Sequence, residues 1–161
     1  MIIGNGDLAT VLKEVQRSDL WFFASGVSNS QEERKEEYER EKELLKSQPY
    51  DCHLVYFSSL GVFFSDTRYI NHKREMESIV KTKFAHYTIV RLGNITWGTN
   101  PHTFINAYRI KPYVVKDEYR YIIDKDEFLD WIKAIPNWSC EMNVQGRRMK
   151  IIDALKEYGN A

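Results

Sequence analysis

The chain has 161 residues, 43% of them apolar and 14% aromatic, which is typical of one folded domain with a sizeable core and not of a disordered chain. Its 23 basic and 23 acidic side chains cancel, so no net field draws it to nucleic acid or to an anionic membrane. Cys52 and Cys140 fit no metal or CxxC spacing, and the first residues form neither a basic leader nor a long apolar run. We therefore expect a soluble cytoplasmic protein without nucleic-acid or membrane partners, in which any phosphate recognition is local.

The first part of the chain alternates short apolar runs with helical patterns. Residues 1–4 predict a minimal buried strand, and residues 7–16 carry apolar side chains at helical spacing. Residues 19–24 predict a second strand, because a continuous apolar run is typical of strands covered on both faces. A helix is expected over residues 31–48 with Ser30 as its N-cap, and its many Glu, Lys and Arg side chains indicate a solvated face. Its few apolar anchors are Tyr38, Leu44 and Leu45.

The rest of the chain continues this alternation. The further strands expected are residues 54–57, 87–92 and 119–123, and the further helices are residues 69–84, 126–135 and 149–158. Strands that alternate with helices favour a parallel α/β sheet. We expect a single domain over residues 1–161, in which residues 99–161 form a reduced part that caps the carboxyl ends of the strands.

A glycine-rich turn separates the first strand from the first helix. Residues 4–9 read Gly-Asn-Gly-Asp-Leu-Ala, a Gly-x-Gly-x-x-Ala pattern. Backbone N–H groups and the helix dipole at such a turn favour a pyrophosphate, and glycines let the backbone approach it. Glycines also occur simply to make turns, so the pattern alone leaves both interpretations open. The candidate cofactor-binding residues here are Gly4, Asn5, Gly6, Asp7 and Leu8.

Tyr69 and Lys73 stand four residues apart, so one helical turn presents both to the same space. A tyrosine with a pKa near about 10 is a poor base at neutral pH, and a nearby ammonium favours its phenolate. Ser59 closes the preceding apolar strand and can hydrogen-bond the same substrate oxygen. Together the three residues can move a proton while a nicotinamide moves a hydride. The alternative is a surface tyrosine beside a solvated lysine.

These motifs resemble the extended short-chain dehydrogenase/reductase superfamily, in particular the NAD-dependent epimerase/dehydratase family that modifies nucleotide sugars. The likeness runs over nearly the whole chain and includes residues 19–25, 57–63, 91–98, 119–126 and 141–146. The resemblance implies a Rossmann-like fold, NAD or NADP as the cofactor and a nucleotide sugar as the substrate.

The resemblance also implies roles for individual residues. Tyr69 is then the acid/base, Lys73 lowers its pKa and holds the cofactor ribose, and Ser59 orients the substrate oxygen. The implied residues of the nicotinamide-side loop are Ala24, Ser25 and Gly26, and those on the substrate side are Asn94 and Arg120.

The chain departs from the family pattern before Asp19. There the family has two further strands, one of which ends in the residue that holds the adenosine ribose. Neither is expected here, and Phe63 replaces the usual tyrosine of its segment. The predicted fold is therefore a parallel sheet with helices on both faces and a reduced number of strands.

Two functions of different classes follow. The first is an NAD(P)-dependent sugar-nucleotide epimerase, dehydratase or reductase of reduced size, for which the resemblance implies polysaccharide or glycan biosynthesis. The second is a catalytically degenerate relative that binds a nucleotide, a sugar or a partner protein, since the adenosine-side strands are missing. A third alternative is a homodimer in which the helices over residues 31–48 and 69–84 pair across a two-fold axis, as the resemblance implies for helices at these positions. No histidine has metal-ligand spacing.

Overall fold

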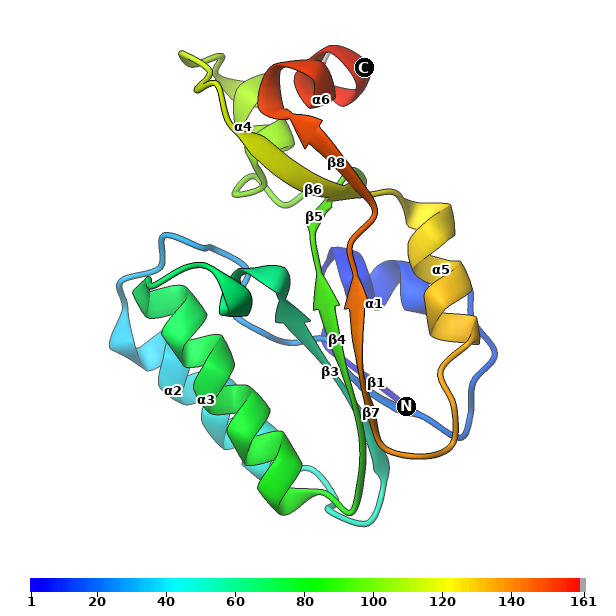
Figure 1. Cartoon of the computed structure of the whole chain (residues 1–161). Coiled ribbons are helices and arrows are strands. Elements are labelled where there is room, and N and C mark those ends of the chain that lie inside the picture. Colours follow the sequence, from blue (N-terminus) through cyan, green and yellow to red (C-terminus); the bar gives the residue numbers. More distant parts are fainter. Residues whose placement is uncertain (160–161) are drawn as a thin grey trace.

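Five parallel strands form the main sheet of the computed structural model, which describes residues 1–159 (Figure 1). The last two residues of the expected ranges 1–161 and 99–161 lie outside the described residues. The strands stand in the order β1, β2, β3, β4, β7, and every neighbouring pair is parallel. Their bounds are Ile2–Ile3 for β1, Trp21–Phe23 for β2, His53–Ser59 for β3, His86–Leu92 for β4 and Cys140–Val144 for β7. The predicted α/β fold is confirmed, and β1 is an edge strand with no adenosine-side strand beyond it.

Helices cover both faces of this sheet. One face packs on α1 (Asp7–Leu12) and α5 (Lys125–Lys133), and the other packs on α2 (Lys35–Lys46) and α3 (Arg68–Lys83). Successive residues of a strand point to opposite faces, so Val55 and Phe57 belong to the α1/α5 face, whereas Leu54 and Tyr56 belong to the α2/α3 face. A short 3-10 helix, η1 (Leu60–Phe63), joins the carboxyl end of β3 to α3.

A small second sheet lies beyond the carboxyl ends of the main strands (Figure 1). It consists of β5 (Asn94–Ile95), β6 (Tyr119–Ile123) and β8 (Arg147–Lys150), and it carries α4 (Phe104–Ile110) and α6 (Ile151–Tyr158). Helix α5 and strand β7 return to the main sheet, so the stretch 99–161 is divided between the two sheets. No helix among residues 1–159 combines the length and apolar character needed to cross a bilayer.

Several predicted boundaries are wrong near the start of the chain. The first helix ends at Leu12 and not at residue 16, and Arg17 beyond it donates to the carbonyl oxygens of Lys133, the last residue of α5, and Ile135. Strand β1 is half-buried and not buried, since it lies at the sheet edge. Helix α2 begins at Lys35, so Ser30 is not its N-cap.

Two further differences have local causes. The Asn29 side chain accepts a hydrogen bond from the Gln31 N–H group at 3.0 Å, which forms a turn where the helix was expected to begin. Strand β8 was not predicted, and residues 149 and 150 belong to it and not to the last helix. Their extended conformation depends on antiparallel pairing with β6, which lies far away in sequence.

Candidate ligand site at the carboxyl ends of the strands

Helix α3 brings Tyr69 and Lys73 together, as their spacing predicted. The Thr67 hydroxyl caps the helix by accepting the Ile70 N–H group at 3.2 Å, so the helix starts just before Tyr69. The Lys73 ammonium lies 5.5 Å from the centroid of the Tyr69 ring. Tyr69 is half-buried, but Lys73 is only 3% exposed. The alternative of a solvated lysine is therefore wrong.

Lys73 is buried because it has an anionic partner on the neighbouring helix. Its Nζ lies 3.6 Å from Oε1 of Glu41 and donates to the Tyr56 hydroxyl at 3.3 Å. Glu41 is fully buried and accepts hydrogen bonds from the Val27 N–H group at 2.6 Å and from the Tyr56 hydroxyl at 2.7 Å. His72 Nε2 lies 3.2 Å from the other carboxylate oxygen. The expected solvated face of α2 thus conceals a buried carboxylate.

The electrostatics of this cluster favour the charged forms of Glu41 and Lys73. Burial would raise the pKa of Glu41, but the Lys73 charge, the nearby His72 and the hydrogen bond from Tyr56 lower it to about 2. Burial would likewise lower the pKa of Lys73, yet the Glu41 carboxylate outweighs it and the pKa is raised. Burial and the same carboxylate hold the pKa of the Tyr56 hydroxyl well above its ordinary value. Glu41 and Lys73 therefore form an ion pair, and Tyr56 stays neutral.

A loop after β2 closes over the Lys73 ammonium. We call residues 25–28 the strap. A side chain at Gly26 would place its Cβ 2.9 Å from Lys73 Nζ and 3.0 Å from Glu41 Oε1, so only glycine leaves room for the pair. The predicted cofactor residue Gly26 thus lies next to Lys73, and Ser25 precedes it in the strap. In this arrangement they cover the ammonium.

The glycine turn after β1 is explained first by packing. Gly4 has φ +121°, and a Cβ there would lie 2.3 Å from the Ala24 carbonyl oxygen at the end of β2. Gly6 has open space where a side chain would stand, and residues 4–6 are exposed. Only this exposed part of the turn can meet a ligand. Leu8 and Ala24 pack against the apolar cluster of the α1/α5 face, which leaves only their backbones for binding.

Asp7 ties the start of α1 to the loop that follows β5. Its carboxylate accepts hydrogen bonds from the N–H groups of Thr99 and Asn100, both at 2.9 Å. Gly98 has φ +96°, and a Cβ there would collide with this carboxylate. Asp7 therefore has a structural partner on the chain itself.

Ser59 is less closely associated with the pair than predicted. Its Oγ accepts the Gly61 N–H group at 3.1 Å and so caps η1. Within residues 1–159 the Tyr69 hydroxyl makes no hydrogen bond, so no bond joins it to Ser59. The preceding Ser58 is the buried serine, and it donates to Glu77 at 2.6 Å.

The two predicted substrate residues lie on the second sheet. Asn94 donates to the Tyr121 carbonyl oxygen at 3.1 Å. Arg120 is exposed and lies 3.6 Å from Glu118. Neither side chain has a hydrogen bond or ion pair with Ser59, Tyr69 or Lys73 among the described residues. A ligand that touches these two side chains as well as Lys73 would therefore have to span both sheets.

The fold is similar to that of two larger proteins of known structure. WbmG of Bordetella bronchiseptica, an enzyme solved with NAD and UDP and also with NAD alone, superposes with TM-scores of 0.54 and 0.52 at 17% and 18% identity. Those alignments cover 66% of this chain and 43% of WbmG. CapF of Staphylococcus aureus, a capsular polysaccharide assembling protein, superposes with a TM-score of 0.58 at 14% identity over 94% of this chain and 45% of CapF.

The chain therefore spans less than half the length of either protein. Neither a protein-family model nor a curated protein sequence matches it. At these identities the likeness shows the fold alone.

The residues at this edge fit one part of an NAD(P) molecule. The open backbone at Gly6 suits a pyrophosphate, and the Lys73 ammonium suits ribose hydroxyls. The fit to Lys73 requires the strap to move, because Gly26 and Glu41 now occupy the space around the ammonium. Because β1 is the edge strand, no strand end stands where the family holds the adenosine ribose.

Glu41 is the functional candidate that the sequence reasoning missed. A signal was present, since Tyr38, Glu41 and Leu45 follow the i, i+3, i+7 spacing of one helix face, and Tyr38 and Leu45 are buried. A carboxylate on that face must find a buried partner.

Proposed function

We propose that this chain binds NAD or NADP and acts on a nucleotide sugar in polysaccharide or glycan biosynthesis, as an epimerase, dehydratase or reductase. The observation that carries the proposal is the placement of Tyr69 and Lys73 one turn apart at the carboxyl end of β3, the edge at which ligands bind in parallel α/β sheets. The fold shared with WbmG, whose structures hold NAD and UDP, gives support.

Each residue has a defined task in this proposal. Tyr69 exchanges a proton with the substrate, and its hydroxyl makes no hydrogen bond within residues 1–159 that would compete with this. Lys73 donates to ribose hydroxyls once the strap has moved. Ser59 is oriented by its bond to Gly61 and can donate its own proton to a substrate oxygen. The nicotinamide, when bound, supplies the hydride chemistry.

Two further features complete the proposal. A cytoplasmic location follows from the cysteine usage and the first residues, and a homodimer that pairs α2 and α3 across a two-fold axis follows from the resemblance. Sedimentation at high protein concentration tests the dimer, and a monomer alone would remove it.

The test measures binding and turnover separately. Calorimetry with NAD(H) and NADP(H) should detect binding at or below millimolar cofactor, and UDP-glucose serves as the substrate probe. Tyr69→Phe should keep cofactor affinity and lower turnover by about 100-fold or more. Tyr50→Phe, which changes an exposed tyrosine in the loop between α2 and β3, is the matched control and should lower neither. Absence of cofactor binding by the unmodified protein would refute the proposal.

A second function is favoured by the pairing of Lys73 with Glu41. The Lys73 ammonium already has a carboxylate and a hydroxyl as partners, so it does not need a ligand. Such an arrangement is expected in a non-catalytic relative. This function predicts that the chain binds UDP without NAD(P), and that Tyr69→Phe leaves biological activity intact. Loss of biological activity in that variant would instead support the enzymatic function.

A further inference from the structure

The Lys73 ammonium is enclosed by groups that come from three elements. Glu41 is on α2, Tyr56 is on β3 and Gly26 is in the strap. A lysine that binds a ribose must present its ammonium to a ligand, whereas this one is 3% exposed. The enclosure therefore has to open before any ligand hydroxyl can reach Nζ.

The strap is held in place at three points. Arg40 donates to the Ser25 carbonyl oxygen at 3.0 Å, and Glu41 accepts the Val27 N–H group. The Asn100 side chain donates to the Ser28 carbonyl oxygen at 3.1 Å. Glu41 contacts both the strap and the ammonium, so loss of its charge affects both.

We propose that Glu41 is an internal competitor for the ligand: its carboxylate holds the Lys73 ammonium and the strap closed, and a ribose-bearing ligand binds by replacing it. The ribose part of this inference rests on the proposed function. Affinity for the ligand is reduced by the fraction of molecules that are closed, so a variant that weakens the closure binds more tightly. Glu41 acts through Lys73 and is a positioning residue.

The closure is measured without any ligand by amine-reactive labelling, with the rate at each lysine read by mass spectrometry. Lys73 should react much more slowly than the exposed Lys35 in the unmodified protein. Glu41→Gln should raise the Lys73 rate by about 10-fold or more, since an opening free energy lowered by 1.4 kcal/mol corresponds to that factor. Glu43→Gln removes the same charge from the exposed side of the same helix and should leave the rate unchanged.

Binding of NADH is then titrated by fluorescence with the same three proteins. Glu41→Gln should tighten NADH binding by about 10-fold, and Glu43→Gln should leave it unchanged. Gly26→Ala is a second variant that keeps the Glu41 charge, and its methyl group should displace the strap and raise both the Lys73 rate and the NADH affinity. It also serves if Glu41→Gln does not fold.

The outcomes separate this inference from the proposed function. Faster labelling of Lys73 without tighter NADH binding overturns competition by Glu41, and so does an unchanged labelling rate. Absence of binding of both NADH and NADPH by all the proteins overturns the proposed function, and the labelling rates alone then uphold or overturn the closure.

Discussion

The two faces of the main sheet are built from different chemistry. The α1/α5 face is a continuous apolar cluster in which Phe57 packs on Phe128, at 5.9 Å between ring centroids. The α2/α3 face has an apolar cluster of its own, which includes Leu54, Met76 and Ile89, but it also holds charged side chains. The buried charged residues of the described chain all lie on this second face, and they are Glu41, Lys73, Glu77 and Arg91.

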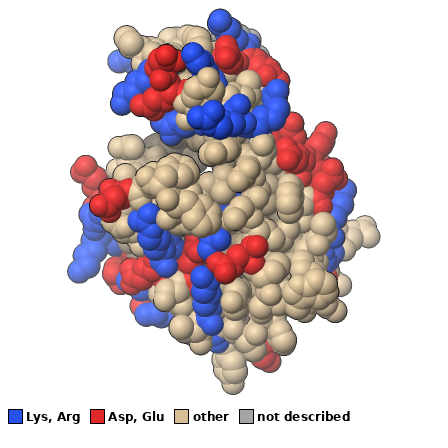
Figure 2. All heavy atoms as spheres, viewed as in Figure 1, with Lys and Arg blue, Asp and Glu red and all other residues tan. Residues whose placement is uncertain are grey.

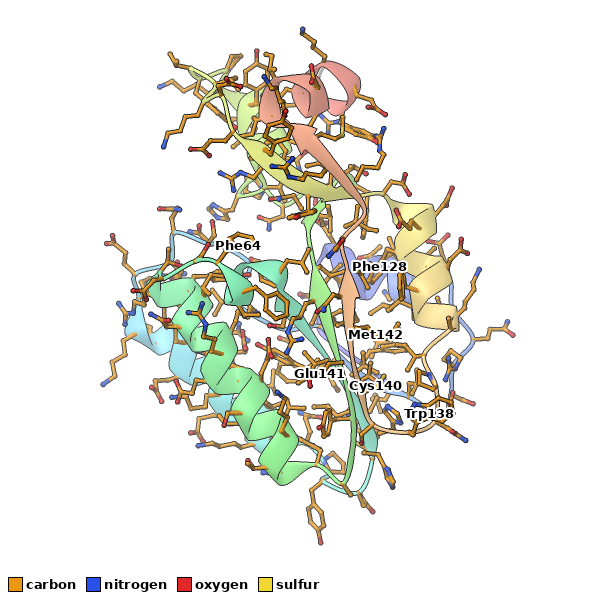
Figure 3. All side chains as sticks on the ribbon, viewed as in Figure 1. Phe64, Phe128, Trp138, Cys140, Glu141 and Met142 are labelled. Carbon is orange, nitrogen blue, oxygen red and sulfur yellow. The ribbon has the colours of Figure 1, made fainter. Side chains whose placement is uncertain are left out.

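The edge strand β7 shows this contrast between neighbouring residues (Figure 3). Met142 packs on the apolar cluster of the α1/α5 face. Glu141 points to the other face, where it binds Arg91 and lies 3.0 Å from Lys81 of α3. The outer surface has no such segregation, since basic and acidic side chains are interspersed on the face seen in Figure 2.

The buried charges on the α2/α3 face indicate that this face has a role besides stabilising the fold. Apolar residues of similar volume stabilise a fold as well as a buried ion pair does, because desolvation offsets the attraction between the charges. The α1/α5 face is built from apolar residues in this way, whereas the α2/α3 face buries charged side chains. The Lys73 pair also stands at the carboxyl ends of the strands, where ligands bind in parallel sheets. A binding role accounts for both facts.

The largest expected effect is on the ion pair itself. Lys73→Met leaves the Glu41 carboxylate buried without a cation and should lower the free energy of unfolding by about 3–5 kcal/mol in urea denaturation. Phe128→Leu on the other face should cost only about 1 kcal/mol, because it is a smaller change in an apolar site. The double variant Glu41→Gln/Lys73→Met should recover most of the loss. A cost below about 1 kcal/mol for Lys73→Met would mean that the buried pair does not form.

The second effect is a dependence of stability on acid. The pKa of Glu41 is about 2 in the folded chain against an ordinary 4.5, so its contribution is complete above pH 4.5 and is lost as the pH falls toward 2. A depression of this size is worth on the order of 3 kcal/mol. Unfolding is measured from about pH 6 to about pH 2 for the unmodified protein and for Glu41→Gln. The difference in the free energy of unfolding between these two proteins should shrink by that amount as the pH falls. The curve of Phe128→Leu should run parallel to that of the unmodified protein. A parallel curve for Glu41→Gln would refute the lowered pKa.

Much of the fold could be predicted because the signals are local. Strands β3, β4 and β6 and helix α3 lie within a few residues of the predicted ranges, since each is specified by a continuous apolar run or by helical spacing. Strand β8 and the start of α2 could not be predicted. The first depends on distant pairing with β6, and the second depends on a turn made by the Asn29 side chain.

The candidate site was predictable only in part for the same reason. The spacing of Tyr69 and Lys73 is local and correctly placed both on one face of α3. The partner of Lys73 is not local, because Glu41 lies 32 residues earlier, on another helix, in a run of charges that resembles a solvated surface. Composition cannot tell which carboxylate of such a run is buried; only its position between Tyr38 and Leu45 can.

The smallest effect separates two neighbouring residues of β3 that face opposite ways. Tyr56→Phe removes the hydroxyl that bonds Glu41 and Lys73 and should cost about 2 kcal/mol, since hydrogen bonds to charged groups are worth about 1.5–3 kcal/mol. Phe57→Leu should cost about 1 kcal/mol through lost packing alone. The two variants are distinguished by measuring unfolding as the pH is lowered. Loss of the Tyr56 hydrogen bond raises the pKa of Glu41, so Tyr56→Phe should lose stability over a narrower pH range. Phe57→Leu should keep the unmodified pH range; if both variants kept it, the Tyr56 hydroxyl would not contribute to the ionisation of Glu41, and the contrast between the faces would reduce to packing.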